Sequence, residues 1–209
     1  MPDENQLLKQ AVSLGGDPDA IREFYENWSR DYDSDLLLAI GYVGPEIAAE
    51  ALAKRVGKTA LVLDAGCGTG LVGIELIKRN FDLTIDGIDL TPAMLEQSRS
   101  KGAYRKLNIA DMCGPLFEID DDVYDGAVCA GVFTNGHVGP DGIDELIRVV
   151  KPGAPVVLTV RDSAWEADGF KDKVEQLEES GKTRTVEISH SPYHTKEDVF
   201  CELVVLEVI

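Results

Sequence analysis

The chain has 209 residues, 44% of them hydrophobic, which is enough to fill one sizeable core. No apolar stretch reaches the ~20 residues that span a bilayer, and no charged-then-apolar leader opens the chain, so we expect a cytoplasmic protein without a membrane partner. The formal net charge of −18 argues against a nucleic-acid partner, because phosphate binding depends on Lys and Arg.

Three helices are predicted in the first part of the chain. Residues 1–16 are polar with a short apolar face, which is typical of a loose helix that ends near two glycines. Asp17 and Pro18 are suited to the N-cap and the first position of a second helix. A third helix is predicted over residues 45–56, with Gly57 as its stop.

The second of these helices has one apolar face. Ile21, Phe24, Tyr25 and Trp28 follow each other at the i, i+3, i+4, i+7 spacing of an amphipathic helix. Packing on the domain accounts for Ile21 and Phe24. Tyr25, Trp28 and Tyr32 differ, because aromatic rings with polar tips suit a half-wet site.

Residues 60–89 predict a β-α-β unit. An apolar run over residues 60–63 ends in Asp64 and a glycine-rich turn, as a buried parallel strand would. A second apolar run, residues 83–88, closes on Asp89. The helix between them is expected to pack through Leu71, Ile74 and Ile77 and to carry a Glu75–Arg79 ion pair.

This unit suits a nucleoside ligand. Glycines let the backbone turn tightly and let a ligand approach, and an acid after the second strand can accept hydrogen bonds from ribose hydroxyls. Both dinucleotides and S-adenosylmethionine use this layout. The dinucleotide pattern Gly68-x-Gly70-x-x-Gly73 begins four residues beyond Asp64, although that fingerprint should begin as the strand ends. The spacing therefore favours S-adenosylmethionine.

The segment Asp64-Ala-Gly66-Cys-Gly68-Thr-Gly70 resembles motif I of the class I S-adenosylmethionine-dependent methyltransferases. Residues 89–95 are similar to the segment that follows the second strand in that family, and the resemblance covers residues 59–161. It implies an α/β fold with three layers: a Rossmann-like, seven-stranded, mostly parallel sheet with an antiparallel edge strand. It also implies S-adenosylmethionine as the cofactor, S-adenosylhomocysteine as the product, and methyl transfer as the activity.

The resemblance also implies which residues contact the cofactor. In the family, an acid at the position of Asp111 faces the adenine amino group and the next residue, here Met112, packs on the ring. Without that role, Asp111 would be a turn residue and Met112 would fill the core. The full set of expected cofactor contacts in the core is Asp64, Gly66, Cys67, Gly68, Asp89, Leu90, Met94, Asp111, Met112 and Ala130.

Residues 25–52 resemble the N-terminal lid of small-molecule methyltransferases, especially the Williams–Beuren syndrome candidate-region methyltransferase-like proteins. In such lids aromatic side chains lie over the cofactor, which implies a contact from Trp28 or Tyr32. We expect residues 1–57 to be a helical lid packed on a Rossmann-like core of residues 58–209, as one structural domain overall.

The remaining elements are predicted from periodicity and turn residues. Helices are expected over residues 92–101 and 141–150 and from residue 170 to a stop at Gly181, and strands over residues 104–107, 123–129 and 154–160. Asp141 is expected to cap its helix, and Ser163 and Glu166 have the spacing of a capping box. Residues 183–189 and 203–209 predict an antiparallel edge pair.

Residues 130–140 follow the fourth strand, where the strand order reverses and open α/β sheets bind ligands. We expect this loop to hold a small-molecule methyl acceptor. His137 is the candidate general base, unless it is a loop histidine bonded to the backbone. Asn135, His137 and Tyr193 are the expected acceptor contacts, and His190 and His194 flank Pro192-Tyr193 as further candidates.

Three other chemistries are not expected. Cys67, Cys113, Cys129 and Cys201 show no metal-type pairing, no His, Asp and Glu cluster has metal spacing, and Cys129 does not follow a proline as the nucleophile of cytosine methyltransferases does. The absence of an Asn/Asp-Pro-Pro-Tyr motif disfavours enzymes that methylate amino groups of nucleic acids and glutamine.

Two alternatives to a small-molecule methyltransferase stay open: a protein that binds S-adenosylmethionine without turnover, and a nicotinamide-dependent oxidoreductase.

Overall fold

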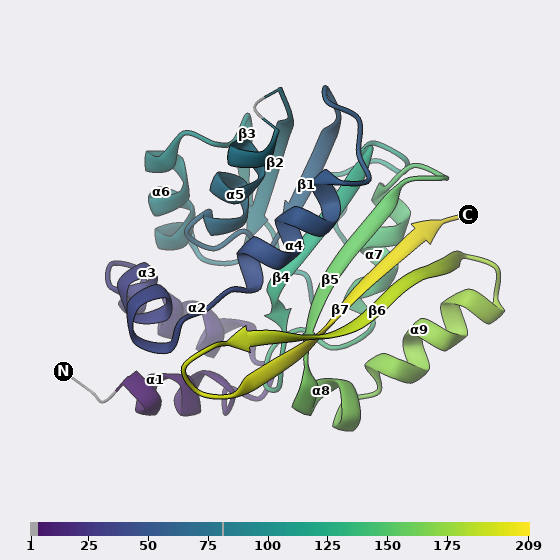
Figure 1. Ribbon diagram of the computed structural model, residues 1–209. Helices are drawn as coiled ribbons and strands as arrows, with labels where there is room; N and C mark the ends of the chain where they lie inside the picture. The colour runs from purple at the N-terminus through teal and green to yellow at the C-terminus, as the bar shows by residue number, and fades with distance from the viewer. Residues whose placement is uncertain (1–3, 81) are drawn as a thin grey trace.

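The core of the molecule is one seven-stranded sheet with helices on both faces (Figure 1). The computed structural model describes residues 4–80 and 82–209. The strand order is β3-β2-β1-β4-β5-β7-β6, with β7 antiparallel to both of its neighbours and the other pairs parallel. The predicted fold is confirmed. The strands are β1 (Leu61–Ala65), β2 (Thr84–Asp89), β3 (Lys106–Ile109), β4 (Gly126–Phe133), β5 (Pro155–Arg161), β6 (Thr183–His194) and β7 (Val199–Val208).

The central strands are apolar along their length because helices cover both of their faces. On one face α4 (Gly44–Ala53) and α5 (Leu71–Arg79) pack on side chains such as Val62 and Val128. On the other face α7 (Gly142–Val149), α8 (Asp162–Ala167) and α9 (Phe170–Glu179) pack on Leu63 and Leu158. The edge strand β6 instead alternates between exposed and partly buried residues over most of its length, as expected of a strand with one face in water.

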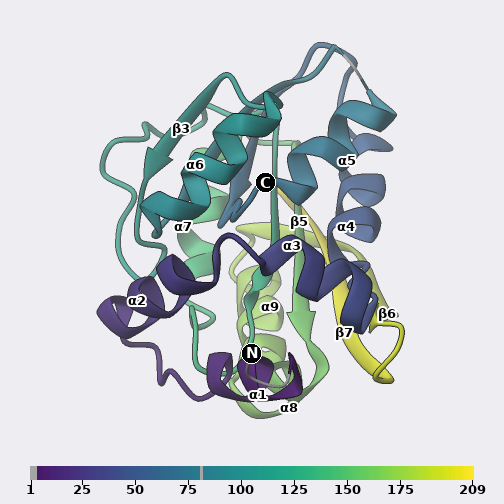
Figure 2. The same ribbon diagram turned by 90° about the vertical axis from the view of Figure 1, so that its left-hand side faces the viewer.

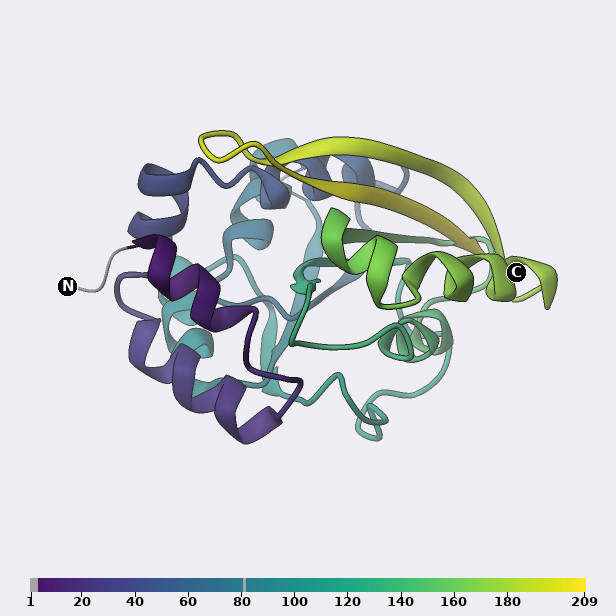
Figure 3. The same ribbon diagram turned by 90° about the horizontal axis from the view of Figure 1, so that it is seen from below.

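The N-terminal elements lie across the carboxyl ends of the parallel strands (Figures 1 and 3). They are α1 (Glu4–Ala11), α2 (Pro18–Trp28), α3 (Tyr32–Ser34) and the π-helical turn η1 (Asp35–Ile40). Phe24, Trp28 and Leu36 form a small apolar cluster there with Tyr193 of β6. We call residues 4–40 the cover. The first three residues of the helix predicted over 1–16 lie outside the described residues.

Helix α6 (Pro92–Lys101) lies next to both the sheet and the cover. It packs on β2 and β3 and touches α2 (Figure 2). As predicted, Pro92 opens it, and Gly102 ends it in the left-handed conformation that glycine tolerates. The N-cap prediction for α2 is also confirmed: Asp17 Oδ1 accepts a hydrogen bond from Asp19 N at 3.0 Å.

The buried face of α5 differs from the predicted one. The predicted Glu75–Arg79 ion pair forms, but the fully buried side chains are Val72 and Leu76, whereas the three residues chosen from the sequence are half-buried. Gly73 explains the rotation, because a Cβ there would lie 2.5 Å from the ring of Tyr104. The helix therefore turns its glycine toward that ring.

Strand β4 runs four residues further than predicted. It begins at Gly126 and continues through Phe133, with a bulge between Cys129 and Phe133. Gly131 has φ +85° in this bulge, and its N–H donates to Thr159 Oγ1 at 3.2 Å. The bulge turns residues 130–132 toward the end of the sheet that the cover occupies. Bulges commonly re-aim side chains in this way.

Two predicted caps do not form. Ser163 lies inside α8, which starts at Asp162, and its hydroxyl donates to Asn135 Oδ1 instead of capping. The Asp141 carboxylate accepts from Lys173 Nζ at 3.1 Å, so it does not bond the first turn of α7. Within residues 4–80 and 82–209, no helix combines the length and the apolarity that crossing a bilayer requires.

Candidate active site

The glycine-rich turn after β1 packs against neighbouring residues at Gly66 and Gly70 and is open at Gly68. Gly66, Gly68 and Gly70 all have positive φ, at +70°, +53° and +91°. A Cβ on Gly66 would lie 2.1 Å from Val132 Cγ2, and one on Gly70 would lie 2.8 Å from Ser98 Oγ. A Cβ on Gly68 would meet no described atom within 4 Å. Backbone at Gly68 is thus directly accessible to a ligand.

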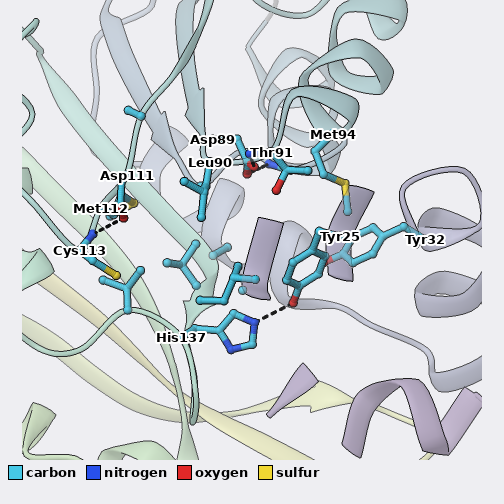
Figure 4. A pocket seen from close by; sticks show the side chains of 18 residues that line it. Tyr25, Tyr32, Asp89, Leu90, Thr91, Met94, Asp111, Met112, Cys113 and His137 are labelled. Carbon is cyan, nitrogen blue, oxygen red and sulfur yellow. Dashed lines mark hydrogen bonds between the residues drawn. The ribbon is translucent and has the colours of Figure 1, made fainter. Parts of the chain in front are cut away.

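Asp89 links this turn to the next strand. Its Oδ2 accepts from Gly68 N at 2.9 Å and its Oδ1 accepts from Thr91 N at 2.8 Å, so the carboxylate fixes both loops (Figure 4). Burial raises the pKa of this carboxyl, and the backbone N–H groups of Thr91 and Gly68 oppose that shift. Each oxygen keeps a lone pair for a further donor.

Asp64 lies beneath the turn and does not face a pocket. It is fully buried, and its Oδ2 accepts from Tyr104 Oη at 2.6 Å. The other oxygen, Oδ1, has no hydrogen-bond partner among the described residues. Burial raises the pKa of Asp64 to about 7, against the stabilising hydrogen bond from Tyr104. The Tyr104 hydroxyl also accepts from Gly73 N at 3.1 Å, so this pair ties the turn to α5.

A pocket lies between the open side of Gly68, the ends of β2, β3 and β4, and the cover. We call it the first pocket. Figure 4 shows Asp89, Leu90 and Thr91 at the top of the view, and Asp111 to the left with its Oδ1 accepting from Cys113 N at 2.8 Å. The lining residues are Ile21, Tyr25, Tyr32, Gly66, Gly68, Asp89, Leu90, Thr91, Met94, Ala110, Asp111, Met112, Cys113, Ala130, Gly131, Val132, His137 and Val138.

Tyr25 and His137 meet at the lower side of this pocket (Figure 4). His137 Nδ1 lies 3.2 Å from the Asn135 carbonyl oxygen, which can only accept, so Nδ1 carries the proton. Nε2 of the neutral ring is then an acceptor, and Tyr25 Oη donates to it at 2.9 Å. Burial lowers the pKa of His137, which keeps the ring neutral.

A second pocket adjoins the first. The two share Tyr25, Tyr32, Gly131 and His137. Aromatic rings dominate the second pocket: Tyr42 and Tyr193 are buried in T-shaped contact, and Trp28 closes it from the cover. The remaining lining residues are Ala11, Val12, Leu36, Thr134, Arg161 and His194.

The structure brings most of the expected contacts to one of the two pockets. The first pocket is lined by Tyr32, Gly66, Gly68, Asp89, Leu90, Met94, Asp111, Met112, Ala130 and His137. Trp28, Tyr193 and His194 line the second pocket, not the first. Asp64, Cys67, Asn135 and His190 line neither.

Each of these four side chains has another contact. Asp64 bonds Tyr104, as described above, and Cys67 is buried in the turn, where burial raises its thiol pKa. Asn135 bonds Asp168 and Ser163. His190 is exposed and pairs with Glu202.

The sequence singles out Tyr25 as suited to a partly solvated site, but the expected cofactor and acceptor contacts do not include it, and the structure places it in the lining. Trp28 is held away from the first pocket because its Nε1 donates to Asp35 Oδ2 at 2.7 Å. Ile21, Thr91 and Val132 were also missed as lining residues.

The cover is attached to the glycine turn by Asp33. One carboxylate oxygen accepts from Thr69 Oγ1 and the other from Lys101 Nζ at 2.6 Å. Lys101 Nζ also donates to Thr69 O. The three side chains therefore join α3, the glycine turn and the end of α6 beside the first pocket.

Comparisons with known proteins agree with this geometry. A family model described as a methyltransferase domain matches residues 62–153. Human methyltransferase-like protein 27 is 32% identical over 174 residues, which cover 79% of this chain and 70% of that protein. The demethylmenaquinone methyltransferase of Deinococcus radiodurans is 36% identical over 113 residues, 53% of this chain and 46% of its own length. A solved TehB-like methyltransferase from Corynebacterium glutamicum superposes with a TM-score of 0.64 at 21% identity, covering 90% of this chain and 99% of that one.

The chain belongs to the S-adenosylmethionine-dependent methyltransferase family. Its cofactor is S-adenosylmethionine. The first pocket fits such a molecule: it has an accessible backbone at Gly68, carboxylates at Asp89 and Asp111, and apolar side chains such as Met94.

Proposed function

We propose that this protein transfers the methyl group of S-adenosylmethionine to a small molecule that occupies the second pocket. The observation that carries the proposal is the shared wall of the two pockets, at Tyr25, Tyr32, Gly131 and His137. The buried rings of the second pocket suit a compact acceptor, and the formal charge of −18 disfavours a nucleic acid. The Deinococcus relative, named for the small molecule demethylmenaquinone, supports the same acceptor class.

In this proposal the first pocket holds the cofactor. Asp89 accepts hydrogen bonds from the ribose hydroxyls with its remaining lone pairs, and Asp111 faces the adenine amino group. Leu90, Met94 and Met112 pack on the adenosine. When bound, S-adenosylmethionine supplies a methyl group on a sulfonium, whose departure leaves a neutral thioether.

The residues at the wall then have two tasks. The first is to position the acceptor atom, and orientation of this kind can lower a barrier by about 7–11 kcal/mol. The second is to remove a proton if the acceptor is a hydroxyl or an ammonium. His137 is the candidate general base, because its neutral ring has Nε2 as an acceptor at the junction of the pockets. Tyr25 holds that nitrogen in place until an acceptor replaces its hydroxyl.

We also infer that the N-terminal elements act as a lid on the core of residues 58–209, with residues 1–57 as the lid region. The cover lines both pockets and supplies Tyr25 and Tyr32 to each. Helix α4, at the end of this region, packs on the face of the sheet and anchors the lid.

The test uses methyl-tritiated S-adenosylmethionine with three acceptor fractions: deproteinised metabolites, proteins and RNA. Label is expected in the metabolite fraction alone, and label in protein or RNA would contradict the acceptor class. Calorimetry with S-adenosylhomocysteine, and with NAD as the control ligand, should show binding of the first only. Binding without label in any fraction would favour the alternative of a binding protein without turnover.

A further inference from the structure

Arg161 is the last residue of β5 and lines the second pocket. Its Nε is buried without a hydrogen-bond partner in the described part of the chain. Among the side chains that the structure describes, the salt bridges involve other residues, and no carboxylate of that set lies within 4.0 Å of the Arg161 guanidinium. A charge that is partly withdrawn from water and unpaired is costly, which makes this arrangement unusual for a purely structural arginine.

The nearby acids are engaged elsewhere. Asp162 follows Arg161 directly, but its Oδ1 accepts from Ser163 N at 2.7 Å. Glu197 lies 3.3 Å from His194 Nδ1. The described residues that line the second pocket include no aspartate or glutamate. In a chain with 38 acidic and 20 basic residues, an arginine that faces a pocket without an acid is unusual, and its guanidinium is available to a ligand.

The position of Arg161 separates it from the cofactor. The glycine turn and Asp89 follow β1 and β2, whereas Arg161 ends β5, and β4 lies between β1 and β5. Arg161 lines only the second pocket, on the far side of the wall formed by Gly131 and His137. Its anionic partner is therefore expected on the acceptor and not on the methionine end of the cofactor.

We propose that Arg161 is a specificity-determining residue and that the acceptor carries a carboxylate next to a planar apolar ring; this rests on the proposed function of the second pocket. The planar guanidinium fork matches a carboxylate with two parallel hydrogen bonds. The rings of Tyr42, Trp28 and Tyr193 form the apolar wall against which a planar body can pack.

The experiment compares acids with their neutral amides. Phenylacetate and phenylacetamide, and indole-3-acetate and indole-3-acetamide, are titrated into the full chain by calorimetry, with and without saturating S-adenosylhomocysteine. Each acid is expected to bind more tightly than its amide. Arg161→Gln should weaken acid binding about 10- to 100-fold, the loss expected for a hydrogen-bonded charge, and leave amide binding unchanged. Arg99→Gln, on the exposed end of α6, is the matched control and should keep the acid preference.

Three outcomes would overturn the inference: no acid binds to the wild-type protein, acids and amides bind equally, or Arg161→Gln retains the acid preference. Weaker S-adenosylhomocysteine binding in Arg161→Gln would instead place the arginine on the cofactor, which also overturns it. Failure of the wild-type protein to bind S-adenosylhomocysteine contradicts the proposed function and is seen separately, because acid preference is also measured without that ligand.

Discussion

The Tyr25 hydroxyl donates a hydrogen bond to His137 Nε2 at 2.9 Å, across 112 positions of the sequence. The bond joins the cover to the segment after β4 and lies where the two pockets meet. Because Nδ1 of the same ring is committed to the Asn135 carbonyl, Nε2 is the nitrogen of His137 left to exchange a proton with an acceptor.

Replacing Tyr25 by Phe should raise the pKa of His137. The tyrosine hydroxyl bonds the neutral form of the ring, which opposes protonation, so its loss favours the imidazolium. Two-dimensional NMR of the imidazole would follow the titration in wild type and variant. If His137 is the base, the acidic limb of the kcat/KM profile should move to higher pH with it. An unchanged titration would contradict the tautomer assignment.

Gly68→Ala should weaken cofactor binding by more than about tenfold without unfolding the protein. The new Cβ would project into the open side of the turn, where a ligand needs to approach. Its positive φ adds about 1–2 kcal/mol of backbone strain.

The matched control for that substitution is Gly102→Ala. Gly102 has φ +69°, and a Cβ added to it would meet no described atom within 4 Å, but it caps α6 outside both pockets. Both variants should lose similar stability in urea, and only Gly68→Ala should lose S-adenosylhomocysteine affinity, by more than about 1.4 kcal/mol, or tenfold in Kd. Equal affinity in the two variants would count against the role of the glycine turn.

Asp89→Asn should weaken S-adenosylhomocysteine binding by about 1.5–3 kcal/mol, the value of hydrogen bonds to a charged group. Asparagine is preferable to alanine here, because its oxygen can still accept from Gly68 N or Thr91 N and preserve the turn. Calorimetry would measure the loss, with the exposed Glu96→Gln on α6 as a control for net charge. Wild-type affinity in Asp89→Asn would refute the ribose contact.

Asp64→Asn should change how stability depends on pH. The pKa of Asp64 is raised from 3.8 to about 7 in the fold, so the folded state holds a proton that the unfolded state releases. The contribution of Asp64 to wild-type stability should therefore fall as pH rises from about 4 to 7 and then level off. The variant lacks this titration, so its free energy of unfolding relative to wild type should rise by about 2 kcal/mol from pH 5 to 7 in urea melts. A constant difference over that range would contradict the raised pKa.

The parts of the site that follow from local sequence could be predicted. The glycine turn and Asp89 belong to one β-α-β unit, where spacing alone places them at the same end of the sheet. The seven-stranded, mostly parallel sheet and its antiparallel edge followed from the family resemblance together with the alternation of residues 183–189.

The remaining features depend on contacts between distant segments. Asp64 lies near the end of β1, where the family resemblance implied a cofactor contact, but Tyr104, 40 residues later, donates a hydrogen bond to it beneath the turn. The bulge at Gly131 extends β4 and re-aims residues 130–132. No spacing of residues in the sequence predicts it. Arg161 reaches a pocket only because β5, β6 and the cover converge there. Pairing across such distances is decided by packing, which local periodicity does not encode.

The hydrogen bonds among Asp33, Thr69 and Lys101 have a kinetic consequence. If the cofactor leaves past the cover on this side, the Asp33–Lys101 ion pair must break. Both of its side chains are partly exposed to water. Salt screens such pairs, so added electrolyte should speed the release of S-adenosylhomocysteine, measurable by stopped-flow fluorescence, more than it alters equilibrium affinity. Turnover limited by product departure would then increase with ionic strength.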